Sequence, residues 1–221
     1  MALGFRGLRP SFVGVLVAAS VAAAAPASAQ EPQSPYVQRL RMLAQLQTLN
    51  ADLLSRDSAT AVLQSLCDRR DPEAPRIRAH RVEAPDNPQA ATAARRQLGA
   101  AANEPIRLRR VELMCGEIVL SRADNWYLPN RLTEDMNSML NTTETPFGVV
   151  VAALRFQRRT LSSRLLFNPL PPGWEAAGEL EFETPATAPP HVLQHRAVLQ
   201  TPDGRPFSLL VETYTDRVLV P

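Results

Sequence analysis

Lysine is absent from this chain of 221 residues, so all 24 of its basic side chains are arginines. Cysteine and histidine are nearly as scarce, with two and three residues respectively. These scattered residues do not make a metal site, and no cysteine and histidine stand in a context typical of a catalytic pair. We therefore predict neither a metal nor a cofactor. Outside the N-terminus, no apolar run approaches the ~18 residues that a membrane span requires.

The N-terminus has the three regions of a secretory signal peptide. Arg6 and Arg9 precede an apolar run, and Ala27-Ser28-Ala29 forms a cleavage site of small residues. We expect residues 1–29 to be a leader that is cleaved after Ala29, and residues 30–221 to be one periplasmic or secreted domain. An uncleaved membrane anchor is the alternative interpretation of the same pattern.

The overall charge belongs to the predicted leader. The formal net charge is +2, and the leader holds two arginines and no acidic residue, so the mature chain has equal numbers of basic and acidic side chains. Nucleic acids and anionic membranes attract proteins with an excess of basic residues. We therefore expect no nucleic-acid partner and no stable membrane anchor, and we expect a monomer.

Apolar spacing predicts a helical hairpin near the mature N-terminus. Ser34-Pro35 is typical of a helix start, and apolar residues from Val37 to Leu53 repeat at steps of three and four. Asp57-Ser58 then caps a second helix that includes Cys67. Because each helix has one apolar stripe, the pair needs a surface to cover, most simply a β-sheet.

The segment that follows, residues 71–105, is rich in proline, alanine, asparagine and arginine. Residues 76–82 are a weak strand candidate, and residues 90–98 are a candidate for a short exposed helix. This composition is typical of chain that buries little apolar surface, so we expect a poorly ordered insertion.

The centre of the chain is predicted to form two strands joined at a glycine. Val111, Leu113 and Cys115 alternate with more polar neighbours, and Gly116 permits the turn because it lacks a Cβ. Arg110 enters this strand beside apolar residues, which is a first indication of a binding site. A solvated arginine at a sheet edge is the alternative, since arginine is mostly exposed.

Later elements complete the prediction of the fold. Thr133 caps a short helix, residues 155–167 form a loose strand, and residues 192–199 and 207–214 form a closing hairpin. The proline-rich residues 169–190 are a flap or an exposed loop. Since helices and strands are segregated along the chain, we predict an α+β domain: a single antiparallel β-sheet with the N-terminal helical hairpin and short helices packed on it.

The two cysteines, Cys67 and Cys115, admit two interpretations. In an oxidising compartment they can form a disulfide that closes a loop of about 48 residues and stabilises the fold by roughly 4 kcal/mol. Alternatively, they are two buried thiols that act as small apolar side chains.

Six short segments, taken in order, resemble a known family. They are Leu54–Thr60, Arg110–Cys115, Tyr127–Pro129, Thr145–Gly148, Arg159–Thr160 and Leu209–Glu212. Each is weak alone, but their order and spacing resemble the chorismate pyruvate-lyase family over roughly Gln38 to Val220. The fold of that family is shared by the ligand-binding domains of some transcription regulators.

The resemblance implies a function and a set of site residues. The family removes pyruvate from chorismate to leave 4-hydroxybenzoate, the ring precursor of ubiquinone, in a largely internal site. By position, Arg110 would hold the substrate carboxylate, and backbone amides near Ala59 and Phe147 would complete its cradle. Glu212 would be the catalytic group at the ring oxygen. These residue types suit such roles, because guanidinium groups pair with carboxylates and a glutamate in an apolar pocket retains its proton more readily.

Three hypotheses therefore remain open. The first is a carbon–oxygen lyase acting on chorismate or a similar enolpyruvyl-bearing ring acid. The second is a non-catalytic periplasmic module of the same fold that binds an aromatic carboxylic acid; the leader favours it, because chorismate is made in the cytoplasm. The third is an envelope protein in which Arg110 and Glu212 form a buried structural ion pair.

Overall fold

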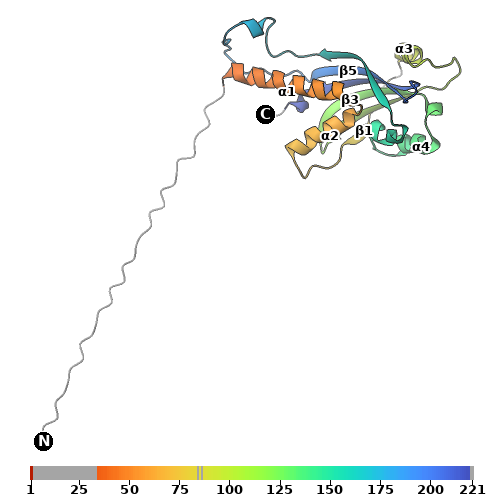
Figure 1. Cartoon of the computed structure of the whole chain (residues 1–221), viewed down its shortest axis with the longest axis horizontal. Helices are drawn as coiled ribbons and strands as arrows, with labels where there is room; N and C mark the ends of the chain where they lie inside the picture. Colours follow the sequence, from red (N-terminus) through yellow and green to blue (C-terminus); the bar gives the residue numbers. More distant parts are fainter. Residues whose placement is uncertain (2–33, 84, 86, 220–221) are drawn as a thin grey trace. The chain divides into compact units, whose positions relative to one another are not determined.

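A single antiparallel sheet organises the chain (Figure 1). Its six strands lie in the order β1-β2-β3-β6-β5-β4. They are β1 (Arg78–Arg81), β2 (Arg107–Cys115), β3 (Ile118–Tyr127), β4 (Gln157–Leu165), β5 (His191–Gln200) and β6 (Pro206–Thr215). The closing hairpin joins the rest of the sheet through β6, which pairs with β3. The last strand of the chain therefore lies at the centre of the sheet.

The structure is a computed structural model, and it describes residues 1, 34–83, 85 and 87–219. The predicted cleavage site and all but the first residue of the predicted leader, residues 1–29, lie outside these ranges. No helix within them is both long and apolar enough to cross a membrane.

The helices begin where capping residues predict them. The α-helices are α1 (Pro35–Ser55), α2 (Ala59–Arg70), α3 (Pro88–Leu98), α4 (Glu134–Thr142) and α5 (Phe147–Val150), and short 3-10 turns span Pro129–Arg131, Ala152–Leu154, Trp174–Ala176 and Asp216–Val218. The side-chain oxygens of Ser34, Ser58 and Thr133 accept hydrogen bonds from backbone N–H groups of the first turns of α1, α2 and α4. These bonds satisfy donors that the helix itself leaves unpaired.

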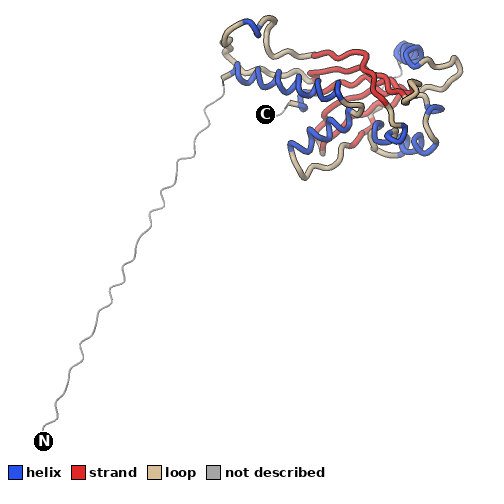
Figure 2. Tube along the Cα trace, viewed as in Figure 1, coloured by secondary structure: helices blue, strands red, loops and turns tan. Residues whose placement is uncertain are grey.

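Different helices cover the two faces of the sheet. The inner face carries Val111, Leu113 and Ala123, which pack against apolar residues of α1 and α2. Helices α4 and α5 extend this layer over the far end of the same face, where Phe147 contacts Tyr127. The outer face carries Arg110, and α3 covers only part of it (Figures 1 and 2). The predicted α+β class, with its antiparallel sheet, helical hairpin and short helices, is confirmed.

The described residues of the segment 71–105 include a strand and a helix, whereas its composition predicts a poorly ordered insertion. Within them, β1 pairs with β2 at the edge of the sheet, and α3 buries Ala94 and Leu98 completely. These two side chains cover an apolar patch of the outer face made by Trp126, Val198 and Leu209. The composition of the segment did not predict this order, because α3 needs only two buried side chains to cover the patch and its other side is polar.

Two long-range ties fix the N-terminal helices. A disulfide joins Cys67 of α2 to Cys115 of β2, with their Cα atoms 5.9 Å apart, which is the pairing in the first of the two sequence interpretations. The proline-rich residues 169–190 lie against α1. Gln38 exchanges two hydrogen bonds with the backbone of Ala186, and the guanidinium of Arg39 stacks 4.1 Å from the ring centroid of Phe182. The connection is therefore a loop bound to the start of α1.

Candidate functional site

A small cavity of about 40 Å³ lies between the inner face of the sheet and the N-terminal ends of α2 and α5. Four polar side chains of the sheet reach it: Arg109, Asn125, Arg158 and Glu212. Apolar side chains, among them Val111, Leu113, Phe147 and Leu210, form much of the remaining wall. A site that is mostly apolar with a few converging polar groups is typical of small-molecule binding.

Strand register brings these polar residues together. Arg109 lies directly opposite Asn125, which in turn lies opposite Leu210. The next row along the inner face runs from Val111 through Ala123 to Glu212. Because side chains directly opposite one another point to the same face of a sheet, residues far apart in the chain meet at one place.

Arg109 is the most unusual side chain of the cavity, because it is a buried cation without an ion-pair partner among the described residues. Only 2% of it is exposed. Its Nη2 donates to the backbone oxygens of Thr143 and Thr145, at 3.4 and 3.1 Å, while Nε and Nη1 have no hydrogen-bond partner within the described ranges. Burial, together with the nearby positive charge of Arg81, lowers the pKa of Arg109 to about 10. An anion would offset this cost of burial.

Asn125 adds a further donor beside Arg109. Its Oδ1 accepts a hydrogen bond of 2.5 Å from the hydroxyl of Ser208, which leaves Nδ2 without a partner in the part of the chain that the structure describes. Both Asn125 and Ser208 are buried. A carboxylate between Arg109 and Asn125 would accept from donors on two neighbouring strands.

Arg158 and Glu212 form a buried ion pair at the cavity wall. Arg158 Nη2 lies 2.5 Å from Glu212 Oε2, and the two side chains are only 2% and 6% exposed. The Tyr214 hydroxyl donates to the same oxygen at 3.3 Å. Burial is the largest single effect and opposes the charge of Arg158, but the attraction and hydrogen bond of Glu212, with smaller contributions from Tyr214 and Asp57, together raise the pKa of Arg158. Burial and the nearby carboxylate raise the pKa of Tyr214.

Behind this pair, His195 lies opposite Glu212 on β5 and is fully buried. Its Nε2 lies 2.8 Å from the Oδ1 of Asn50 in α1, which also accepts a hydrogen bond from Ser163. Burial, followed by the nearby charge of Arg158, lowers the pKa of His195 to about 4. The imidazole is therefore neutral at physiological pH, and it lies on the same face of the sheet as Glu212.

The prediction that Arg110 and Glu212 face one enclosed pocket is wrong. Arg110 lies opposite Asp124 on the outer face and pairs with it through Nε–Oδ1 and Nη2–Oδ2 contacts of 2.5 and 2.7 Å. This pairing raises the pKa of Arg110. The two residues are also not a structural bridge, since Glu212 pairs with Arg158 on the inner face. Their strands are separated by β3.

The other predicted site residues do meet. Ala59, Phe147 and Glu212 all line the cavity, and Arg109 occupies the place that the sequence prediction gave to Arg110. A signal for Arg109 was present, because it precedes Val111 and Leu113 by even steps and so belongs to their apolar face. Arg158 and Asn125 had no comparable signal. Within the described ranges, no group of three or more histidine, cysteine, aspartate or glutamate side chains is placed to hold a metal.

One comparison with known proteins shows a family. The chain is 47% identical over 194 residues to "Uncharacterized protein y4mC" of Sinorhizobium fredii, which covers 86% of this chain and 81% of that protein. The chain belongs to the y4mC family. No family model matches it. Membership in the y4mC family does not name a ligand or a reaction.

Solved structures give weaker likenesses. PhnF from Mycobacterium smegmatis has a TM-score of 0.43 at 13% identity and covers 76% of this chain and 67% of that one. The effector domain of PhnF has a TM-score of 0.42 at 13% identity, with 73% and 90% covered. A GntR-family transcriptional regulator from Enterococcus faecalis has a TM-score of 0.37 at 10% identity, with 67% and 96% covered. Because these TM-scores lie below 0.5, they carry no argument about the site.

Proposed function

We propose that the cavity binds a small carboxylic acid, with Arg109 and Asn125 as its anchors. The observation that carries this proposal is the set of buried donors that converge there: Arg109 Nε and Nη1 and Asn125 Nδ2, none with a partner in the described ranges. Hydrogen bonds between charged groups are stronger than neutral ones, so a carboxylate gains most at this place.

The apolar lining of the cavity favours an aromatic acid, whose entry requires the wall to open, because a cavity of about 40 Å³ is smaller than a benzene ring needs. Val111, Leu113, Phe147 and Leu210 offer apolar contacts beside the polar anchors. An aromatic ring buries a large apolar area with few rotatable bonds, so it gains contacts at a small entropic cost. The ligand class that we propose is therefore an aromatic carboxylic acid, of which 4-hydroxybenzoate is the simplest probe.

Binding without turnover is the function that the geometry supports best. Glu212, the predicted catalytic group, has Arg158 and Tyr214 as close partners on one oxygen. These partners occupy Oε2 of Glu212, so that oxygen is already engaged and is not available to a substrate ring oxygen. A chorismate pyruvate-lyase activity is the second candidate. The meeting of Glu212, Ala59 and Phe147 at one cavity, as the family resemblance implies, favours it.

Export to an oxidising compartment is part of the proposal. The N-terminal pattern of residues 1–29 supports it, and so does the Cys67–Cys115 disulfide, because structural disulfides persist chiefly outside the cytoplasm. N-terminal sequencing of the envelope-fraction protein would be expected to begin at Gln30, and an intact Met1 in the cytoplasm would refute export.

Binding and turnover can be separated in one experiment. Calorimetric titration with 4-hydroxybenzoate should give a saturable heat, and incubation with chorismate should release no 4-hydroxybenzoate or pyruvate. Replacing Arg109 by leucine should weaken binding about 10- to 100-fold, the range for a lost charged hydrogen bond. Arg110→Leu is the matched control, since it removes the neighbouring arginine from the other face and should leave affinity unchanged. Release of pyruvate would establish the lyase instead, and equal losses in both variants would refute the site.

A further inference from the structure

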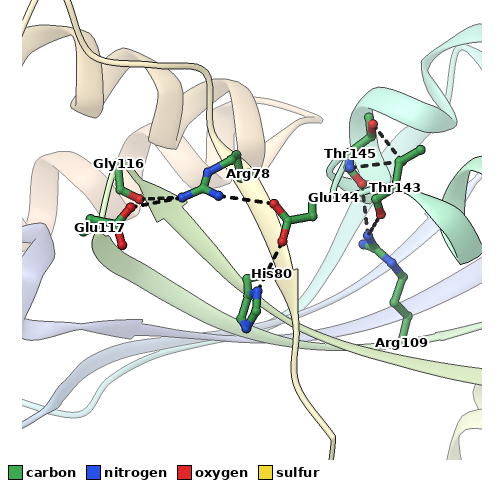
Figure 3. Close-up of polar contacts among 8 residues, drawn as sticks. All are labelled: Arg78, His80, Arg109, Gly116, Glu117, Thr143, Glu144 and Thr145. Carbon is green, nitrogen blue, oxygen red and sulfur yellow. Dashed lines mark hydrogen bonds and ion pairs between the residues drawn. The ribbon is translucent and has the colours of Figure 1, made fainter.

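Residues 143–145, which join α4 to α5 and which we call the strap, are held from two sides (Figure 3). On the cavity side, the backbone oxygens of Thr143 and Thr145 both accept from Nη2 of Arg109. On the opposite side, the backbone oxygen of Glu144 accepts a hydrogen bond of 2.7 Å from the N–H of Ala79 in β1. Thr143 and Thr145 therefore contact Arg109 on the cavity side, and Glu144 between them contacts the edge strand β1.

The side chain of Glu144 strengthens the outer attachment. Its Oε2 lies 3.3 Å from Arg78 Nη1, and its Oε1 lies 3.2 Å from His80 Nδ1 (Figure 3). The hydrogen bond with His80 and the charge of Arg78 lower the pKa of Glu144, which keeps it ionised. Arg78 also contacts Glu117, which does not touch the strap. All of these side chains are largely exposed, so each pair contributes little on its own.

The geometry of a guanidinium makes the inner attachment significant. A guanidinium has two edges that can hold both oxygens of a carboxylate, Nε with Nη2 and Nη1 with Nη2, so Nη2 belongs to both. In Arg109, Nη2 is the one nitrogen engaged within the described residues, and it donates to two strap oxygens. A carboxylate that forms paired hydrogen bonds to Arg109 must use Nη2 and therefore competes with these two strap oxygens.

We propose that the strap is a ligand-responsive element. A bound carboxylate competes with the backbone oxygens of Thr143 and Thr145 for Arg109, and the strap moves when these oxygens lose their hydrogen bonds to Arg109. This inference rests on the proposed function, because it needs an acid at Arg109. The strap continues into Phe147 and Gly148, which also line the cavity. Displacement of the strap therefore changes the cavity wall and, through Glu144, loosens the outer edge of β1. Binding of a ligand in the cavity is thus coupled to the attachment of β1 at the edge of the sheet.

Ligand binding should speed amide hydrogen exchange at one position of β1, which is the opposite of the usual effect. Binding of a ligand commonly slows amide exchange, whereas saturating 4-hydroxybenzoate should here speed the exchange of the Ala79 amide, whose acceptor is Glu144. The Val82 amide is an internal control, because it bonds to the backbone oxygen of Arg110 in β2 and not to the strap. Both amides can be followed by NMR in the same sample of the wild-type protein.

A variant gives a second test, in which removal of a side chain should increase the affinity for the ligand. Glu144→Ala removes the outer side-chain contacts and should tighten binding of 4-hydroxybenzoate about two- to fivefold, because the strap is then easier to displace and exposed ion pairs contribute little. Glu117→Ala removes the other acidic partner of Arg78 and should leave affinity unchanged. Unchanged or slower exchange of Ala79 with bound acid, or weaker binding by Glu144→Ala, overturns the inference. Failure of the wild-type protein to bind any of the acid refutes the proposed function itself, and the inference with it.

Discussion

The disulfide between Cys67 and Cys115 joins two elements that both line the cavity. Cys67 lies on α2, whose first residue, Ala59, contributes to the wall, and Cys115 lies on the same face of β2 as Arg109. The bond therefore fixes the helical side of the cavity relative to the strand that carries Arg109, its proposed anchor. A site fixed before the ligand arrives loses less entropy on binding.

Removal of this disulfide should lower stability strongly. For the double variant Cys67→Ala/Cys115→Ala, the expected loss in the free energy of unfolding is roughly 4 kcal/mol, because the bond constrains an unfolded loop of 48 residues. Urea denaturation of the variant and of the wild-type protein checks this value. A reductant should destabilise the wild-type protein by a similar amount and leave the variant unaffected. A loss below 1 kcal/mol would contradict the constraint.

The buried pair of Arg158 and Glu212 should behave differently from exposed pairs. Replacing Arg158 by methionine, or Glu212 by leucine, should each cost about 3–5 kcal/mol, because either change leaves an uncompensated buried charge. The double variant should recover much of the loss, since it buries no charge. Arg78→Met, which breaks exposed pairs, is the control and should cost at most ~1 kcal/mol. Additive losses in the double variant, measured by denaturation, would argue against a coupled pair.

His195 should make stability depend on pH in the acidic range. Its pKa falls from 6.5 to about 4 in the folded protein, chiefly through burial and then through the charge of Arg158, with Glu212 acting in the opposite direction. Between these values the unfolded chain binds a proton that the folded protein does not, so stability falls as the pH drops from 6.5 towards 4 and this effect ends below 4.

The loss attributable to His195 is on the order of 3 kcal/mol. Urea denaturation at several pH values measures it, and His195→Gln should flatten the curve over this window while keeping a donor for Asn50. His80→Gln, at an exposed position, is the matched control and should retain the slope. If His195→Gln shows the same dependence of stability on pH as the wild-type protein, the imidazole of His195 is excluded as the cause of that dependence.

Local chemistry determined much of this fold from the sequence. The starts of α1, α2 and α4 follow from Ser34, Ser58 and Thr133, because capping is a short-range interaction between a side chain and the next turn. The β2–β3 turn follows from Gly116, which has a φ of +56° that residues with a Cβ rarely adopt. The alternation in β2 also placed Arg110 correctly on the face opposite Val111.

Strand order and register were decided only by the tertiary structure. The sequence gives no measure of which strands are neighbours, because the pairing of β3 with β6 joins segments that are about 90 residues apart. The family resemblance associated Glu212 with Arg110, whereas in the fold Glu212 pairs with Arg158 and lines the same cavity as Arg109. A shift of one residue reverses the face of a strand. The alternation in β2 gives the face on which Arg109 lies, but only long-range packing shows that Arg109, Arg158 and Glu212 share one cavity on that face.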